Sequence, residues 1–283
     1  MLKLAVQAKG RLNEKTIRLL TDSGIRLPQT SRSLILKASG FPLEVLYLRD
    51  DDIPQAVAMG VADIGIVGEN EVAESDLRIE TIMKLGFGKC RLSLAAPKGC
   101  ECNSLDWFNN KRVATSYPHI LEKFFIHKGI NAYIHKIAGS VEVAPAVGMA
   151  DAIFDIVSSG GTLVQNGLIE ICSVMESEAV LVANPQLSDD KCNLIEKLKL
   201  RLNSIIQSEG YKYVLMNLPP EAVEKAVNLI PGMKSPTLIP LANSDWYALQ
   251  VVLHENDLWD KIEQLKQIGA EDILVLQLEN IIR

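Results

Sequence analysis

The sequence has no hydrophobic run that approaches the roughly 20 residues of a membrane-spanning helix. Its first ten residues have neither a long apolar core nor a small-residue cleavage site, so they predict a buried strand rather than a secretory signal. The 5 cysteines are scattered and odd in number, which argues against a disulfide framework. These absences exclude membrane-embedded and disulfide-rich secreted proteins and predict a cytoplasmic location.

Positive charge is also scarce, with 29 Lys and Arg against 35 Asp and Glu, a net charge of -6. This balance argues against nucleic acid or an anionic membrane as the partner. A phosphate-bearing ligand must then be held locally, by a few cations and backbone amides. The 48% hydrophobic and 23% charged residues are typical of a globular protein, and 283 residues suffice for about two domains.

Strand patterns alternate with helix patterns in the first part of the chain. Residues 2–7, 43–49 and 62–67 predict buried strands, and residues 12–21 have helical periodicity. The run Asp50-Asp51-Asp52-Ile53-Pro54 predicts a helix start, because acids and an early proline suit the unpaired N–H groups there. Such alternation is typical of a parallel α/β sheet.

A short internal repeat indicates two lobes. Residues 54–64 resemble residues 145–153, and for each we expect a short helix, a tight turn and a buried strand. Two periplasmic-binding-protein-like lobes would then face each other across a cleft, the place where open α/β sheets bind ligands. The expected boundaries are residues 1–93 with 172–210 for lobe I and 94–171 for lobe II, with strands at 112–115, 132–137 and 152–157 and a covering helix at 189–208.

The pattern changes at residue 211. Strands at 211–218, 237–241, 246–254 and 272–278 and helices at 221–229 and 257–267 follow in the order βαββαβ. This order predicts a C-terminal ferredoxin-like module over residues 211–283. By fold analogy alone, such a module behind an enzyme binds a regulatory ligand.

The chemistry concentrates in residues 151–163, where an apolar strand that contains Asp155 runs into Ser158-Ser159-Gly160-Gly161-Thr162. Small residues let the backbone approach a phosphate, and N–H groups and hydroxyls donate to it. Asp155 is placed to accept hydrogen bonds from the vicinal hydroxyls of a sugar, so the segment has the layout for a ribose 5-phosphate. A glycine-rich turn with capping hydroxyls is the alternative, which this segment alone leaves open.

Ordered motifs continue along the rest of the chain, at residues 7–12, 48–54, 63–70, 90–94, 114–118, 139–145, 236–241 and 273–276. With the segment 151–163 they make nearly the whole chain resemble the long-form, hexameric ATP phosphoribosyltransferases that open histidine biosynthesis. Gly161 departs from that family, whose members usually have alanine there.

The resemblance implies a pentosyl transfer, in which N1 of the adenine of ATP attacks C1 of phosphoribosyl pyrophosphate (PRPP) and pyrophosphate leaves. No strong base is needed because N1 already has a lone pair, so positioning and charge stabilisation suffice. The resemblance further implies Mg²⁺ held mostly by the substrates, histidine as a feedback inhibitor bound by residues 211–283, and a homo-hexamer together with a dimeric form.

The resemblance also implies residue roles, each with a structural alternative: a solvated cation, a capping acid or a packed tyrosine. The catalytic candidates are Lys9, Arg11 and Asp155. The PRPP candidates are Asp155, Ser158, Ser159, Gly160, Gly161, Thr162 and Leu163. The ATP candidates are Arg11, Arg32, Arg49 and Tyr117, and the candidates for Mg²⁺ are Glu142 and Asp151.

Two other functions stay open at this point: a two-lobed small-molecule binding protein, and a regulatory protein without catalysis. The phosphate segment together with Lys9 and Arg11 favours the transferase over both. The pair Cys100 and Cys102 has the wrong spacing for a usual zinc site and lacks a second pair.

Overall fold

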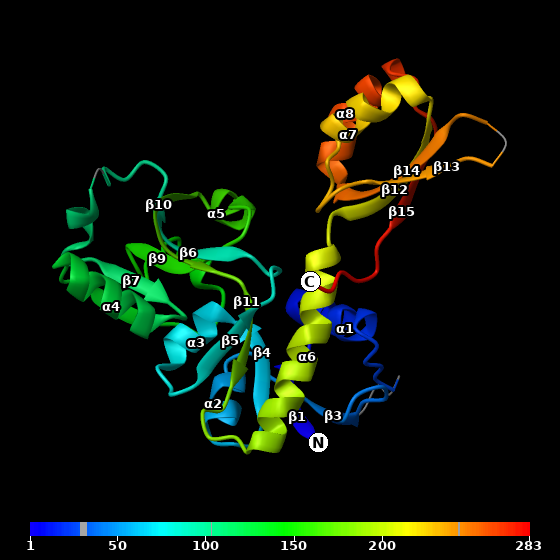
Figure 1. Cartoon of the computed structure of the whole chain (residues 1–283). Helices are drawn as coiled ribbons and strands as arrows, with labels where there is room; N and C mark the ends of the chain where they lie inside the picture. Colours follow the sequence, from blue (N-terminus) through cyan, green and yellow to red (C-terminus); the bar gives the residue numbers. More distant parts are fainter. Residues whose placement is uncertain (29–32, 103, 243) are drawn as a thin grey trace. The chain divides into compact units, whose positions relative to one another are not determined.

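The computed structural model describes residues 1–28, 33–102, 104–242 and 244–283 (Figure 1). The chain divides into two compact units, Met1–Lys197 and Leu198–Arg283. The first unit contains two sheets and the second unit one. Within the described ranges no helix combines the length and the apolar character needed to cross a membrane.

The first sheet has six strands in the order β2-β3-β1-β4-β11-β5. Its central strands β1, β3 and β4 run parallel, so their carboxyl ends lie at one edge. Helices cover the sheet, so most side chains of these strands are buried. Most of their residues are accordingly apolar. The strands are β1 (Leu2–Gln7), β2 (Ile35–Lys37), β3 (Leu43–Leu48), β4 (Ile64–Gly68), β5 (Glu80–Lys84) and β11 (Ala179–Ala183), and the helices are α1 (Arg11–Asp22), α2 (Ile53–Ala58) and α3 (Glu69–Ser75).

The second sheet has five strands in the order β10-β6-β9-β7-β8, of which β7, β8 and β9 are parallel. Its core is built around the fully buried Phe108 and Phe154. The strands are β6 (Cys90–Pro97), β7 (Arg112–Thr115), β8 (Tyr133–Lys136), β9 (Ala152–Val157) and β10 (Leu168–Ser177). The helices are α4 (Pro118–Lys128) and α5 (Gly161–Gln165), with 3₁₀ turns η1 (Leu105–Phe108) and η2 (Val141–Val143).

In the structure, the second sheet begins earlier and ends later along the chain than the expected lobe II. Strand β6 begins at Cys90, and β10 continues to Ser177, both within the second sheet. Residues 90–93 and 172–177 therefore pair in the second sheet, whereas the sequence assigned them to lobe I. The expected helix in the second copy of the repeat is wrong: residues 144–148 form turns, so only the strands of the repeat correspond.

The second unit has one antiparallel sheet in the order β13-β14-β12-β15, with the element order βαββαβ that the sequence predicted. Alternate residues of β12, including Val214 and Met216, face a core shared with α7 and α8. The elements are β12 (Tyr211–Leu218), η3 (Pro220–Ala222), α7 (Val223–Leu229), β13 (Thr237–Pro240), β14 (Tyr247–His254), α8 (Glu255–Gln267) and β15 (Glu271–Gln277). The expected α/β class with a ferredoxin-like module is confirmed. Helix α6 (Asp189–Ser208) spans the boundary of the two units.

Candidate active site

The carboxyl ends of β1 and β3 meet at the edge of the first sheet. The N–H of Ala8 donates to the carbonyl of Leu48 at 2.7 Å, and Nε2 of Gln7 donates to Oδ2 of Asp50 at 3.3 Å. Gly10, with φ of 99°, then turns the chain into α1, a conformation that favours glycine. Lys9 directly precedes this turn, and Arg11 is the first residue of the helix.

The expected cations differ in their surroundings. Lys9 and Arg11 are exposed, and neither has an acidic partner among the residues that the structure describes. Arg49 forms an exposed ion pair with Asp51 at 3.1 Å, which contributes little to stability and can open to a ligand. Arg32, the fourth expected cation, lies outside the described residues.

Directly after β9 comes the expected phosphate segment, residues 158–163. Ser158, Ser159 and Thr162 are exposed, so their hydroxyls are open to a ligand, while Leu163 is buried and fixes the segment to the core. Gly160 has φ of 80°, and a Cβ there would meet nothing within 4 Å. The backbone is therefore open to close approach from outside.

Asp155 and Glu142 lie together beside this segment. Burial raises the pKa of Asp155 to about 6, the N–H of Ile156 at 2.8 Å opposes that rise, and the charge of Glu142 adds to it. The two carboxylates are therefore close enough for their charges to interact. A half-buried carboxylate with few donors is suited to accept hydrogen bonds from a sugar.

Asp151 has other contacts. Its Oδ1 accepts from Nη2 of Arg112 at 3.0 Å, and its Oδ2 accepts from the backbone N–H of Arg112 at 2.9 Å, which hold its pKa below the usual range. It precedes β9 whereas Ser158 follows it, so about 20 Å of strand separates them at about 3.3 Å per residue. The carboxylate of Asp151 pairs β9 with β7, and we leave it out of the site.

Tyr117 is packed rather than free to stack. Its side chain is 9% exposed in the second core, and its hydroxyl donates to Oε1 of Glu71 at 3.0 Å. Burial raises its pKa first, followed by the negative charges of Glu71, Asp155 and Asp50. The hydroxyl of Tyr117 therefore lies where acids from both sheets converge.

Glu71 is the residue of this junction that the sequence analysis missed. Burial raises its pKa to about 7, the hydrogen bond from Tyr117 lowers it, and the charges of Asp50, Asp51 and Glu74 raise it further. Its position just beyond the carboxyl end of β4 was the available signal. Its pairing with α4 depends on tertiary structure.

A metal site made by protein side chains alone is not evident. Across the four described ranges, no group of three or more His, Cys, Asp or Glu residues is arranged to hold a metal ion. The carboxylates of Glu142 and Asp155 carry the hard oxygen donors that Mg²⁺ prefers, whereas Oε1 of Glu71 already accepts from Tyr117 and Asn70.

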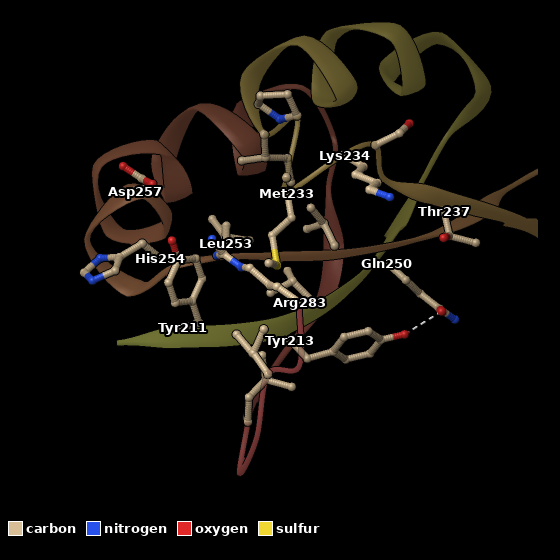
Figure 2. Close-up of a pocket in the computed structure, with 18 of the residues that line it drawn as sticks. Tyr211, Tyr213, Met233, Lys234, Thr237, Gln250, Leu253, His254, Asp257 and Arg283 are labelled. Atoms are coloured by element: carbon tan, nitrogen blue, oxygen red, sulfur yellow. Dashed lines mark hydrogen bonds between the residues drawn. The ribbon is translucent and has the colours of Figure 1, made fainter. Parts of the chain in front are cut away.

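A separate cavity of about 1180 Å³ lies in the second unit (Figure 2). Figure 2 shows Met233 and Arg283 in the middle of the view, and the hydroxyl of Tyr213 donating to Oε1 of Gln250, at 2.5 Å. Cationic side chains, an acid, aromatic rings and apolar groups all line it, among them Lys234, Lys261, Arg283, Asp257, Tyr211 and Leu253. This mixture suits a small ligand with both charges and an apolar or aromatic part.

Comparison with known proteins gives consistent matches over the whole chain. The family model described as ATP phosphoribosyltransferase matches residues 49–204, and the one described as HisG, C-terminal domain matches residues 208–280. An ATP phosphoribosyltransferase of Bacteroides thetaiotaomicron is 55% identical over 282 residues, which cover 100% of each chain.

Two solved structures place the fold. The ATP phosphoribosyl transferase (HisG:HisZ) complex from Thermotoga maritima aligns with a TM-score of 0.63 and 30% identity, covering 73% of this chain and 99% of that chain. The substrate binding protein of an amino acid ABC transporter aligns with a TM-score of 0.50 and 12% identity, covering 74% of this chain and 94% of that chain. The second likeness concerns the fold alone and confirms the expected two-lobed, binding-protein-like architecture.

Proposed function

The chain belongs to the ATP phosphoribosyltransferase family, and on this premise we propose that the junction of its first two sheets is where ATP and PRPP react. The observation that carries the proposal is the succession of Asp155 and an open phosphate segment, residues 158–163, at the carboxyl end of β9. Acids and cations from the first sheet border the same junction. Our proposed lobes remain residues 1–93 with 172–210 for lobe I and residues 94–171 for lobe II. Residues 90–93 and 172–177 belong to strands of the second sheet, so the boundary between the lobes shifts there.

PRPP binds through its ribose phosphate end in this proposal. The carboxylate of Asp155 accepts hydrogen bonds from the ribose hydroxyls, and the backbone N–H groups of Gly160 and Gly161 with the hydroxyls of Ser158, Ser159 and Thr162 donate to the 5-phosphate. Leu163 fixes the segment from below. What supports these roles is the half-burial of Asp155 and the exposure of the hydroxyls.

Lys9 and Arg11 bind the pyrophosphate of PRPP or the phosphates of ATP, with Arg49 as a further candidate. The support is their exposure at the carboxyl edge of the first sheet, without an acid in reach among the described residues for the first two. As N1 of adenine forms a bond to C1 of the ribose, the bond from C1 to pyrophosphate breaks and its electron pair leaves with the phosphate oxygen. Cations near that oxygen stabilise the negative charge that develops there.

Mg²⁺ fits this site through its oxygen donors, with Glu142, whose charge acts on Asp155, as the candidate protein carboxylate. The ion would neutralise substrate phosphate charge and orient the leaving pyrophosphate. Substrate oxygens provide most of its ligands in this proposal, because Asp151 is engaged by Arg112. The chain's own residues hold the ribose and the 5-phosphate.

The cavity of the second unit is our candidate for the site of feedback inhibition by histidine. Its mixture of cations, an acid and aromatic rings supports binding of an amino acid with an aromatic side chain. Inhibition requires a ligand that favours an inactive arrangement over an active one, and we propose that packing of subunits in a homo-hexamer, with a dimer as the smaller form, supplies these arrangements. We place the enzyme in the cytoplasm.

The test is a direct assay with ATP, PRPP and Mg²⁺. Phosphoribosyl-ATP and pyrophosphate should appear in equal amounts, and excess chelator should stop the reaction. Histidine should lower the rate without purely competing with PRPP. A folded protein that makes no product under any of these conditions, or the same yield with chelator, contradicts the proposal.

A further inference from the structure

Helices α3 and α4 follow strands of different sheets, and the end of α3 contacts the start of α4. The carboxylate of Glu74, on α3, accepts hydrogen bonds from the backbone N–H groups of His119 and Ile120, both at 3.1 Å. These are first-turn amides of α4, whose own N-cap residue makes no side-chain cap. A residue of the first sheet's helix therefore caps a helix of the second.

A salt bridge extends this contact along α4. Nζ of Lys123 lies 2.6 Å from Oδ1 of Asp76, and both side chains are more than half exposed. An exposed pair of this kind contributes little by itself. The rim of the contact thus consists of Glu74 on α3 and Asp76 directly after it, against the first turns of α4.

The buried part of the same contact is Glu71 with Tyr117. Oε1 of Glu71 accepts from the hydroxyl of Tyr117 at 3.0 Å and from Nδ2 of Asn70 at 2.8 Å. Tyr117 is almost fully buried and packs in the core of the second sheet, against which Ala73 of α3 also packs. This hydrogen bond is shielded from water, so it is worth more than the exposed contacts at the rim.

The position of the bond connects it to the active site. Tyr117 comes two residues after β7, which pairs with β9, and β9 carries Asp155. Glu71 comes three residues after β4, at the edge that also presents Asp50. This hydrogen bond therefore joins the two walls between which the proposed reaction takes place, as do the buried hydrogen bonds of Asn70 with Ser177 of β10.

We propose that Glu71 is a positioning residue of the phosphoribosyl transfer, which acts by holding the Tyr117 hydroxyl and thereby fixes the segment that binds PRPP relative to the edge that presents Lys9 and Arg11. The inference rests on the proposed location of the reaction. A displacement of about 1 Å between two reacting groups lowers rates by up to 100-fold, so a partly buried tether close to both substrates matters.

The surroundings of Glu71 make the tether sensitive to protons. Tyr117 faces it from the residue directly before α4, Asp50 and Asp51 from the segment after β3, Glu74 from its own helix, and Cys90 from the start of β6. All of these groups from the described part of the chain are acidic or neutral, and none is a cation. Ionised Glu71 thus adds a negative charge beside a site for two polyphosphates, whereas neutral Glu71 keeps the tether without that charge.

The experiment uses the full chain with the variants Glu71→Ala, Glu71→Gln, Tyr117→Phe and the double variant Glu71→Ala/Tyr117→Phe. For each, kcat and both KM values are measured between pH 6 and 8.5, together with hydrogen exchange of the first-turn amides of α4. We expect Glu71→Ala and Tyr117→Phe each to raise the KM for PRPP about tenfold, and the double variant to be no worse than either, because both remove one hydrogen bond. Glu71→Gln retains an acceptor and should stay within about twofold of the wild type at pH 8, while losing the inflection of the wild type near pH 7.

Glu122→Ala is the matched control, since Glu122 is an exposed acid on α4 outside the contact. Kinetic constants of Glu71→Ala equal to those of Glu122→Ala, or additive losses in the double variant, overturn the proposal. So does an unchanged exchange rate at the start of α4 in Glu71→Ala. If the wild type itself forms no phosphoribosyl-ATP, the proposed reaction fails, and the exchange measurement still decides whether Glu71 holds α4.

Discussion

The guanidinium of Arg91 reaches the backbone carbonyl of Ser158, with Nη1 3.4 Å from the oxygen, and its other two nitrogens hold Glu170. Arg91 lies in β6, between β9 and β10, so one side chain ties three neighbouring strands at the residue where the phosphate segment starts. Because Ser158 is the first residue after β9, this contact limits where the following hydroxyls and N–H groups can lie. It gives a way to disturb the segment without altering any residue in it.

Arg91→Met should therefore weaken PRPP binding more than ATP binding. The methionine keeps much of the packing of the arginine stem but removes the contact to Ser158, so we expect the KM for PRPP to rise about tenfold. Arg112→Met is the control, because it breaks a comparable ion pair with Asp151 at the other end of β9. Steady-state kinetics with each substrate varied in turn measure both. Equal effects on PRPP in the two variants would show that only sheet stability changed.

The two glycines of the phosphate segment should respond differently to alanine. Gly160 has φ of 80°, so Gly160→Ala forces a left-handed conformation that costs about 1–2 kcal/mol, and it should lower both stability and PRPP affinity. At Gly161 a new Cβ would lie 3.7 Å from Oγ of Ser159, an ordinary contact, and alanine favours the helix by up to about 1 kcal/mol. Thermal unfolding and calorimetric titration with PRPP measure both effects. A Gly161→Ala protein with weaker PRPP binding than Gly160→Ala would contradict the assignment of the segment.

The parts that sequence predicted well are those fixed by local pattern. Strand β12 and helix α6 have the predicted bounds because alternation and helical periodicity are strong there, and β9 was located because it leads into the glycines. The expected N-terminal acid cap of α2 was only partly right, since Asp52 makes no side-chain cap bond and Asp51 pairs with Arg49 instead. Strands β2 and β5 were not predicted; they are short edge strands whose pairing depends on neighbours far away in sequence.

The candidate site shows the same limit. Asp155 and the serines follow one another in the chain, so their proximity was visible in the sequence. The pairing of Asp151 with Arg112 could not be predicted, because Arg112 starts the strand beside β9 and that adjacency requires the strand order. Glu71 was missed for the same reason, because α4 comes to it from the other sheet. Contacts of this kind are decided by topology rather than by residue type.

Glu71→Gln should change how stability depends on pH. The pKa of Glu71 in the folded protein is about 7, above the ordinary value of 4.5, so the folded state holds this proton more tightly than the unfolded state does. Its contribution to stability is therefore fully present below about pH 4.5 and is lost as the pH rises through about 7. The neutral glutamine has no such loss, so the difference in unfolding free energy should move in favour of the variant between pH 5 and 8, by on the order of 1–3 kcal/mol. Denaturant titrations of both proteins at several pH values measure it, and parallel pH curves would rule out the effect.

The cavity of the second unit leads to the last prediction, on histidine. Gln250 lines its wall and accepts a hydrogen bond from Tyr213, so Gln250→Leu keeps the size of the side chain while removing the polar groups that a bound amino acid would meet. The free hydroxyl of Tyr213 is then left without its acceptor. Loss of one or two hydrogen bonds should weaken histidine binding at least about tenfold, since a tenfold change corresponds to about 1.4 kcal/mol.

Gln264→Leu makes the same replacement on an exposed face of α8, outside the cavity, and should leave histidine affinity as in the wild type. Calorimetric titration of the three full-length proteins with histidine decides between them. Equal affinity in all three would place the histidine site elsewhere, whereas weaker binding in Gln264→Leu alone would point to the outer face of α8.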